Sequence, residues 1–187
     1  PTPGTAWAGY TAAGAAGAGS SNLSLGTGDA ADAIDLYIGD VGVEDSLGHR
    51  RWVLNDPLGV VGIGFAGNAG CLGVFDSSGS GSRPWTSWPN AGPAPIAEVT
   101  DAFGRAVTWS FHSRSIGISG ATATVTRVSD GAPLPVTSRV LPSGYGPDTL
   151  AFAPMGWAPA AGQTYRVSIS GTSSGTIDYD VELVSCP

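Results

Sequence analysis

The sequence predicts an α+β protein in which a helix-containing first part is followed by an all-β sandwich. Three observations support this prediction. Apolar residues recur at three- and four-residue steps between 29 and 41, which is the period of an amphipathic helix. Six strand-like runs follow between 107 and 184, separated by turns rich in Gly, Pro and Ser. Hydrophobic residues make up 42% of the 187 residues, enough to build buried cores.

The first part predicts one clear helix, two weaker helices and a hairpin. Three aspartates lie in the first half of segment 29–41, where the helix dipole favours negative charge. Segment 12–18 is a weaker helix because its glycines lower helix propensity. A short helix or turn is expected at 47–54. Two apolar runs joined by a Gly- and Asn-containing turn, 60–66 and 71–76, predict a β-hairpin.

The second part is expected to begin after residue 95, which divides the chain into domains 1–95 and 96–187. Between them, residues 77–95 are predicted to form a long ordered crossing. The last strand alternates strictly between apolar and acidic residues, which is typical of an antiparallel sheet with one solvated face. The number and spacing of the strands favour an immunoglobulin-like or fibronectin-like sandwich. The six expected strands are 107–112, 121–128, 134–141, 149–153, 164–170 and 176–184.

Charge and hydropathy exclude several classes of partner. The formal net charge is -7, and all eight basic residues are Arg. Duplex nucleic acid and anionic membranes favour a basic surface, so neither is an expected partner. No apolar run approaches the roughly 20 residues of a membrane-spanning helix. No motif for a cofactor is found, and we predict none.

Cysteine usage and composition favour an exported protein. Cys71 and Cys186 lie far apart, without His or Cys neighbours at metal-ligand spacing. They are either buried free thiols or one long-range disulfide, and we predict the disulfide. The absence of Lys and the abundance of Ser, Thr and Gly resemble exported bacterial proteins. The chain begins at Pro1 without an initiator Met, which we interpret as a processed or trimmed chain.

Residues 48–52, Gly-His-Arg-Arg-Trp, hold the densest chemistry. His49 can be a structural residue paired with a carboxylate, a base or a metal ligand. With three flanking segments the motif resembles the second half of a bacterial CAP domain, the superfamily of cysteine-rich secretory proteins, antigen 5 and plant pathogenesis-related proteins. The resemblance covers about residues 7–76. The segments are 20–23, the helix 29–41, 48–57 and 61–64.

The resemblance implies a partial α-β-α sandwich with a central cavity, which in some members holds a divalent metal on two His and two acids. His49 matches the second His, and Asp40 or Glu44 takes the place of one acid. Asn22 follows the usual position of the other acid, which is Ser21 here. The first His belongs to an upstream helix that this chain lacks. Because at most two of four ligands are present, we predict that no metal is bound.

The preferred function is an exported, non-enzymatic binding or adhesion module, secreted or at the cell surface. Its expected ligand-binding residues are His49, Arg50, Trp52 and Asn22. A first alternative is a secreted hydrolase, possibly a protease, in which Ser20 or Ser21 attacks, His49 is the base and Asp40 or Glu44 orients it. A second alternative is a structural subunit of a surface assembly.

Two surfaces remain open to interpretation. Trp85 and Trp88 are either a platform for sugars or anchors of the crossing segment. Segment 1–28 has Trp7 and Tyr10 as its only large aromatic residues, too few to cover a sheet face. We therefore expect a second polypeptide or a homo-oligomer to cover the face left by the missing helix. The isolated chain should then show an exposed apolar patch.

Overall fold

The computed structural model describes residues 3–101 and 104–186, and it shows a predominantly β protein with three sheets and about 15% helix. The predicted α+β class, with its CAP-like α-β-α sandwich, is therefore wrong. The helices are short: α1 covers Ala12–Gly19, α2 Ala30–Gly39 and α3 Gly48–Val53. None of the Ala and Gly residues of α1 is buried, so α1 does not form a second helical layer.

The ends of α2 follow from local chemistry. Asp29 caps its first turn by accepting hydrogen bonds from the backbone N–H groups of Ala31 and Asp32. The helix ends at Asp40, which adopts the left-handed conformation with φ of 49°. The helix expected at 29–41 is confirmed, one residue shorter at its start and two at its end. The short helices expected near 12–18 and 47–54 are also present, as α1 and α3.

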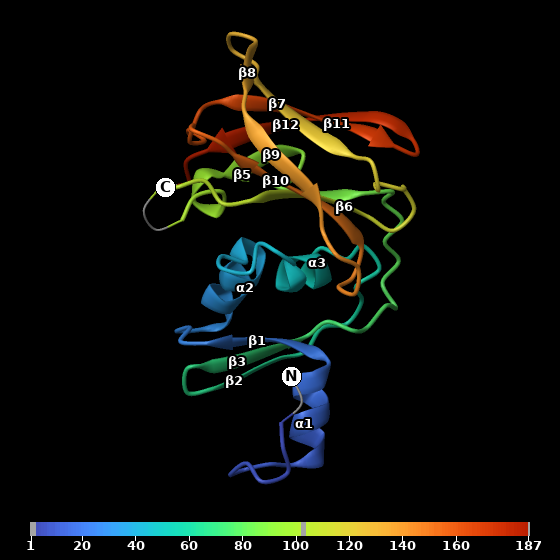
Figure 1. Ribbon diagram of the computed structural model, residues 1–187. Coiled ribbons are helices and arrows are strands. Elements are labelled where there is room, and N and C mark those ends of the chain that lie inside the picture. Colours follow the sequence, from blue (N-terminus) through green and yellow to red (C-terminus); the bar gives the residue numbers. More distant parts are fainter. Residues whose placement is uncertain (1–2, 102–103, 187) are drawn as a thin grey trace.

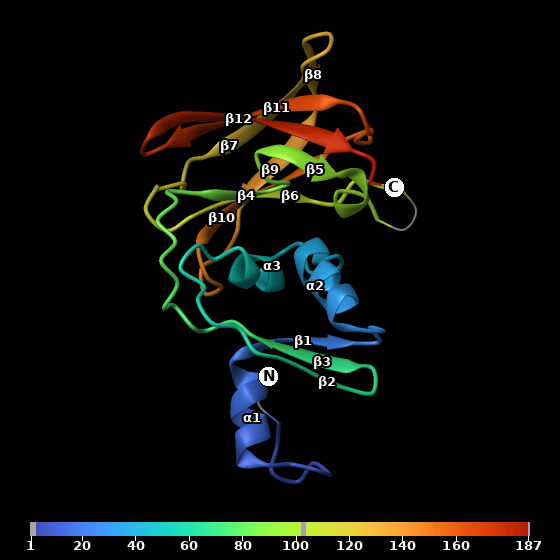
Figure 2. The same cartoon turned by 180° about the vertical axis from the view of Figure 1, so that it is seen from behind.

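A small antiparallel sheet holds the predicted hairpin. Its strands are β1 (Ser21–Leu25), β2 (Ile63–Ala66) and β3 (Ala69–Gly73), in the order β1-β3-β2. The pairing of β2 with β3 confirms the hairpin. Helices α2 and α3 cover one face of this sheet, and α1 extends from the opposite side (Figures 1 and 2). The core between the sheet and the helices contains Ala33, Tyr37, Leu72 and Val74.

Two further sheets form a sandwich, with strand orders β4-β6-β10-β9 and β5-β12-β11-β7-β8. Each of the six expected strand runs contains a strand. The crossing segment 77–95 contains two further strands, β4 and β5. Both precede residue 96, where the second domain was expected to begin, yet β4 pairs with β6 and β5 pairs with β12. The sandwich strands are β4 (Thr86–Trp88), β5 (Gly92–Pro95), β6 (Trp109–Ser113), β7 (Thr122–Arg127), β8 (Ala132–Leu134), β9 (Val136–Val140), β10 (Asp148–Pro154), β11 (Thr164–Thr172) and β12 (Gly175–Val184).

Strand β6 is buried on both faces, and this positions the residues discussed below. Trp109 and Phe111 point into the sandwich core. Because side chains alternate along a strand, Ser110 and His112 point to the other face. That face is covered by α3 (Figure 1). Helices α2 and α3 thus lie between the small sheet and the sandwich (Figure 1).

The predicted disulfide is wrong, because Cys71 and Cys186 are both free thiols. Cys71 lies on β3 and Cys186 follows β12. These strands belong to sheets on opposite sides of the helices, as both views show (Figures 1 and 2). No helix in the described part of the chain is long and apolar enough to cross a bilayer.

Candidate functional site

A cavity of about 330 Å3, the His49 cavity, lies beside α3. The start of β1 contributes Ser21 and Asn22 to its wall, and α3 contributes His49 and Trp52. Tyr145 reaches it from the loop between β9 and β10. Residues from four separate stretches of the chain, 19–22, 43–52, 74–75 and Tyr145, therefore meet here. The remaining lining residues are small or apolar, apart from one serine: Gly19, Val43, Ser46, Gly48, Val74 and Phe75.

The geometry of His49 is set by Asp40. The buried carboxylate of Asp40 accepts a hydrogen bond from Nδ1 of His49 at 2.7 Å, and it also accepts from the backbone N–H groups of His49 and Arg50. The left-handed turn at the end of α2 brings Asp40 into this position. Because the carboxylate accepts, the proton of the neutral ring lies on Nδ1 and Nε2 is an acceptor. Within the described chain, no hydrogen bond involves Nε2.

The other predicted site residues have different positions. No hydrogen bond or ion pair joins Glu44 to His49 in the described part of the chain; the Glu44 carboxylate accepts a hydrogen bond from the backbone N–H of Gly42. Asn22 is buried and donates to the backbone carbonyl of His49, so it positions α3. Ser21 lines the cavity, but no hydrogen bond joins its hydroxyl to His49 in the part of the chain that the structure describes.

Two aromatic contacts shape the cavity. Trp52 packs against Phe75, with ring centroids 4.6 Å apart. The ring of His49 stacks on Tyr37, which is buried beneath it, with centroids 5.5 Å apart. The imidazole is thus held by a hydrogen bond at one edge and by a ring at one face. The histidine side chain is still 39% exposed, so a ligand in the cavity can reach it.

Arg50 and Arg51 face away from the cavity and into the protein. Both side chains are fully buried. Arg50 donates to the carbonyls of Ile38, Gly39 and Thr108 and to the hydroxyl of Ser110. Arg51 donates to the carbonyls of Ser46, Pro142 and Pro147. These contacts join α3 to the end of α2 and to the sandwich. Arg50, expected to bind a ligand, is not available to one.

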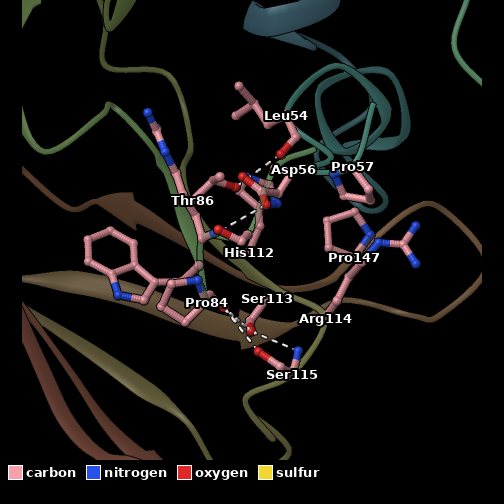
Figure 3. Close-up of a pocket in the computed structure, with 14 residues that line it drawn as sticks. Leu54, Asp56, Pro57, Pro84, Thr86, His112, Ser113, Arg114, Ser115 and Pro147 are labelled. Atoms are coloured by element: carbon pink, nitrogen blue, oxygen red, sulfur yellow. Dashed lines mark hydrogen bonds between the residues drawn. The ribbon is translucent and has the colours of Figure 1, made fainter. Parts of the chain in front are cut away.

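A second cavity of about 320 Å3, the proline cavity, is lined by residues of the segment after α3 and of the strands β4 and β6 (Figure 3). Pro57, Pro84 and Pro147 form much of its wall, and buried His112 lies at its floor. The Arg114 side chain is directed away from His112 in this view, and its Nε donates to Asn55. The charged groups of this cavity do not converge on a common point, which disfavours an anion site.

Trp85 lies at the edge of the sandwich core. Its ring contacts Phe111 and Tyr179, with centroids 5.5 and 5.3 Å away. Both partners are buried core residues, so the ring anchors the crossing segment to the sandwich. This arrangement favours the anchor over the sugar platform for Trp85.

The outer face of the small sheet, which we define by Leu23, Leu25, Ala66, Ala69 and Cys71, is apolar and open. Trp7 lies beside it, and together these residues line a hollow of about 740 Å3. Trp7 is 69% exposed and Leu25 is 76% exposed. Apolar side chains are thus exposed to solvent on this face of the small sheet.

Sequence reasoning missed two features of this region. Tyr145 lines the His49 cavity from about 100 residues further along the chain, and no local pattern connects the two positions. The second feature is the burial of His112. The alternation Trp-Ser-Phe-His at 109–112 could have indicated a polar face on β6, but not that this face is buried.

Chemically, the His49 cavity offers an oriented hydrogen-bond acceptor among aromatic rings. Within the described ranges, no group of three or more His, Cys, Asp or Glu is arranged to hold a metal ion. Comparison with models of known families finds no match to this chain, and neither does comparison with curated proteins.

Proposed function

We propose that the chain is an exported, non-enzymatic binding module whose ligand occupies the His49 cavity. One observation carries the proposal: Asp40 holds Nδ1 of His49, which leaves Nε2 as an acceptor at an open cavity. Apart from His49 itself, the described lining residues carry no ionisable acid or base of the Asp, Glu, Lys or Arg type. The ligand that fits is neutral, with a hydroxyl or amide donor next to an apolar ring or chain.

Export and family membership rest on the residues alone. The absence of Lys and the low content of charged residues, 12%, support export. The resemblance of residues 48–57 and their flanking segments to the CAP superfamily supports a site centred on His49. It does not extend to the architecture, which is predominantly β.

A fragment screen tests the binding proposal. The 15N-labelled chain is titrated with neutral fragments that carry a hydroxyl or amide beside an aromatic or aliphatic ring. Binders should shift the signals of His49, Trp52 and Tyr145. His49→Gln should weaken their binding about tenfold, because the ligand loses one well-oriented hydrogen bond.

Arg114→Gln, in the proline cavity, is the matched control and should leave this binding unchanged. Fragments that bind only outside the His49 cavity would contradict the proposal. Equal binding to the wild-type chain and to His49→Gln would contradict it as well.

The pair of Asp40 and His49 also supports a second candidate, a hydrolase. An Asp that holds Nδ1 of a His is the orienting half of a catalytic triad, and Ser21 lines the same cavity. A fluorophosphonate probe distinguishes the two candidates. Labelling that is lost in both Ser21→Ala and His49→Gln would favour the hydrolase, and the absence of labelling would favour the binding module.

A partner over the outer face belongs to the same proposal. The hollow beside Trp7 is lined by apolar or small residues, and α1 leaves it open. We propose that a second polypeptide or a second copy covers it. Light scattering should then report a mass above 18.7 kDa, or a peptide should co-purify with the chain. A monomer of 18.7 kDa would contradict this part of the proposal.

A further inference from the structure

The hydrogen-bond partners of buried His112 determine its tautomer. The hydroxyl of Thr149 donates its only proton to the carbonyl of Pro147, so it accepts from Nδ1 of His112 at 2.9 Å. Nε2 of His112 is then the acceptor and receives the proton of the Ser110 hydroxyl at 2.8 Å. Neutral His112 with its proton on Nδ1 satisfies every one of these groups.

This chain of hydrogen bonds ends on a buried arginine at each side. The Ser110 oxygen accepts from Nη1 of Arg50 at 3.1 Å. The carbonyl of Pro147 accepts from Nε and Nη2 of Arg51 at 3.1 and 2.9 Å. His112 therefore links two guanidinium groups that are both fully buried. We call His112, Ser110, Thr149, Arg50 and Arg51 the joint network.

Arg50 connects the joint network to the His49 cavity. Its Nε and Nη2 donate to the carbonyls of Ile38 and Gly39, the last residues of α2. Its backbone N–H donates to the carboxylate of Asp40. The position of Asp40, and with it the orientation of His49, thus depends on where the Arg50 guanidinium is held.

A second proton on His112 cannot be accommodated in this arrangement. Nε2–H would make the Ser110 oxygen an acceptor toward His112, and the hydroxyl proton of Ser110 would lose its acceptor. A third positive charge would also be buried beside Arg50 and Arg51. Burial, followed by the two guanidinium groups, lowers the pKa of His112 well below its usual range.

The other charged groups around the network do not offset this charge. Asp148 precedes Thr149 on β10, and Asp40 lies beyond Arg50. Asp56, Arg83 and Arg114 line the proline cavity together with His112. No hydrogen bond or ion pair in the described part of the chain joins any of these carboxylates to His112.

We propose that His112 is an acid-sensitive latch: its protonation releases Arg50 from Ser110 and frees the end of α2, Asp40 and α3. The consequence for a ligand rests on the proposed function of the His49 cavity. Acid would open the joint between the helices and the sandwich, and the oriented acceptor at His49 would be lost. The latch is a positioning device, because His112 does not line the His49 cavity.

Backbone amide exchange of the ligand-free chain tests the latch. The open state binds a proton at His112 with its ordinary pKa of 6.5. Between pH 7 and pH 5, the opening equilibrium should therefore rise roughly 20- to 30-fold. Protection of residues 38–53, corrected for intrinsic exchange rates, should fall by that factor, while β11 and β12 stay protected.

His112→Gln should abolish the pH dependence, and His49→Gln, the matched control, should retain it. Unchanged protection in the wild-type chain would overturn the proposal, and so would a loss of protection that persists in His112→Gln. Should His112→Gln fail to fold, imidazole 15N signals of the wild-type chain serve instead. They should show the Nδ1–H tautomer at pH 7 and protonation together with the loss of protection. Protonation of His112 with residues 38–53 still protected would overturn the latch.

This experiment is independent of the fragment screen, since no ligand is used. An intact latch without fragment binding at pH 7 would reject the proposed function alone. Fragment binding without the change in exchange would reject the latch alone.

Discussion

Arg50 and Arg51 are adjacent residues that serve the fold through their length and their five N–H donors. Their guanidinium groups reach backbone carbonyls on the end of α2 and on sandwich segments about 60 to 95 residues away. In the described chain neither group forms an ion pair with a carboxylate. Burial lowers the pKa of Arg50 to about 10, although Asp40 and Glu44 act in the opposite direction. The contribution of Arg50 and Arg51 to the stability of the fold therefore comes from satisfied hydrogen bonds rather than from ion pairs.

Arg50→Lys should lower the free energy of unfolding by about 2 kcal/mol or more. Lysine has three donors and no planar fork, so some of the carbonyls of Ile38, Gly39 and Thr108 lose their partner while buried. Urea denaturation measures the change. Arg166→Lys, in an exposed pair with Asp180, is the control and should cost less than about 1 kcal/mol. Similar losses in the two variants would contradict this account of Arg50.

At the scale of elements, a buried leucine packs the start of α3 against the sandwich. Leu47 precedes α3 in a left-handed conformation with φ of 46°, and it is fully buried. Its side chain packs against Leu141 and Ala151, which belong to the sandwich. The helix α3 thus begins at a residue that the sandwich itself holds in place.

Leu47→Ala should destabilise the protein by about 2–4 kcal/mol, because it leaves a cavity among buried apolar residues. Leu25→Ala is the matched control. Leu25 lies on the outer face with most of its side chain in solvent, so its truncation should change the free energy of unfolding by less than about 0.5 kcal/mol. The two values come from urea denaturation of both variants. A loss below about 1 kcal/mol for Leu47→Ala would show that the sandwich does not hold this residue.

At the scale of the whole molecule, the joint between helices and sandwich predicts how stability depends on pH. The folded chain keeps His112 neutral, because its pKa lies well below 6.5, while the unfolded chain binds a proton there. As the pH falls below 6.5, the unfolded state therefore binds a proton at His112 that the folded state does not bind. The free energy of unfolding decreases as a result. The loss should reach about 2 kcal/mol between pH 7 and pH 5. Urea denaturation at a series of pH values measures it, and His112→Gln should remove most of the slope.

Carboxylates contribute little to this pH window. Asp76, Asp130 and Asp180 have lowered pKa values in the folded chain. The stability that they contribute is lost only as the pH falls toward and below about 4, where they become protonated. Glu98 acts in the opposite sense, because burial and the charge of Asp35 raise its pKa. A stability that stays constant between pH 7 and pH 5 would contradict the assignment of His112 as a buried neutral group.

Much of the local structure could be predicted from the sequence, because its signals are local. The apolar periodicity and the helix dipole predict α2, the Gly- and Asn-containing turn predicts the β2–β3 hairpin, and alternation predicts β12. The juxtaposition of Asp40 and His49 was one of two alternatives that the sequence left open. The left-handed turn at Asp40 and the position of α3 decide between Asp40 and Glu44.

The sequence by itself determined the short helices and most of the strands, and it predicted a site at His49. Only the tertiary structure decided the predominantly β class, the separation of Cys71 from Cys186, the burial of Arg50 and the joint network around His112. The physical reason is the range of the interactions. Caps, turns and periodicity act over a few neighbouring residues, whereas these four features depend on which sheet each strand joins and which face α3 covers.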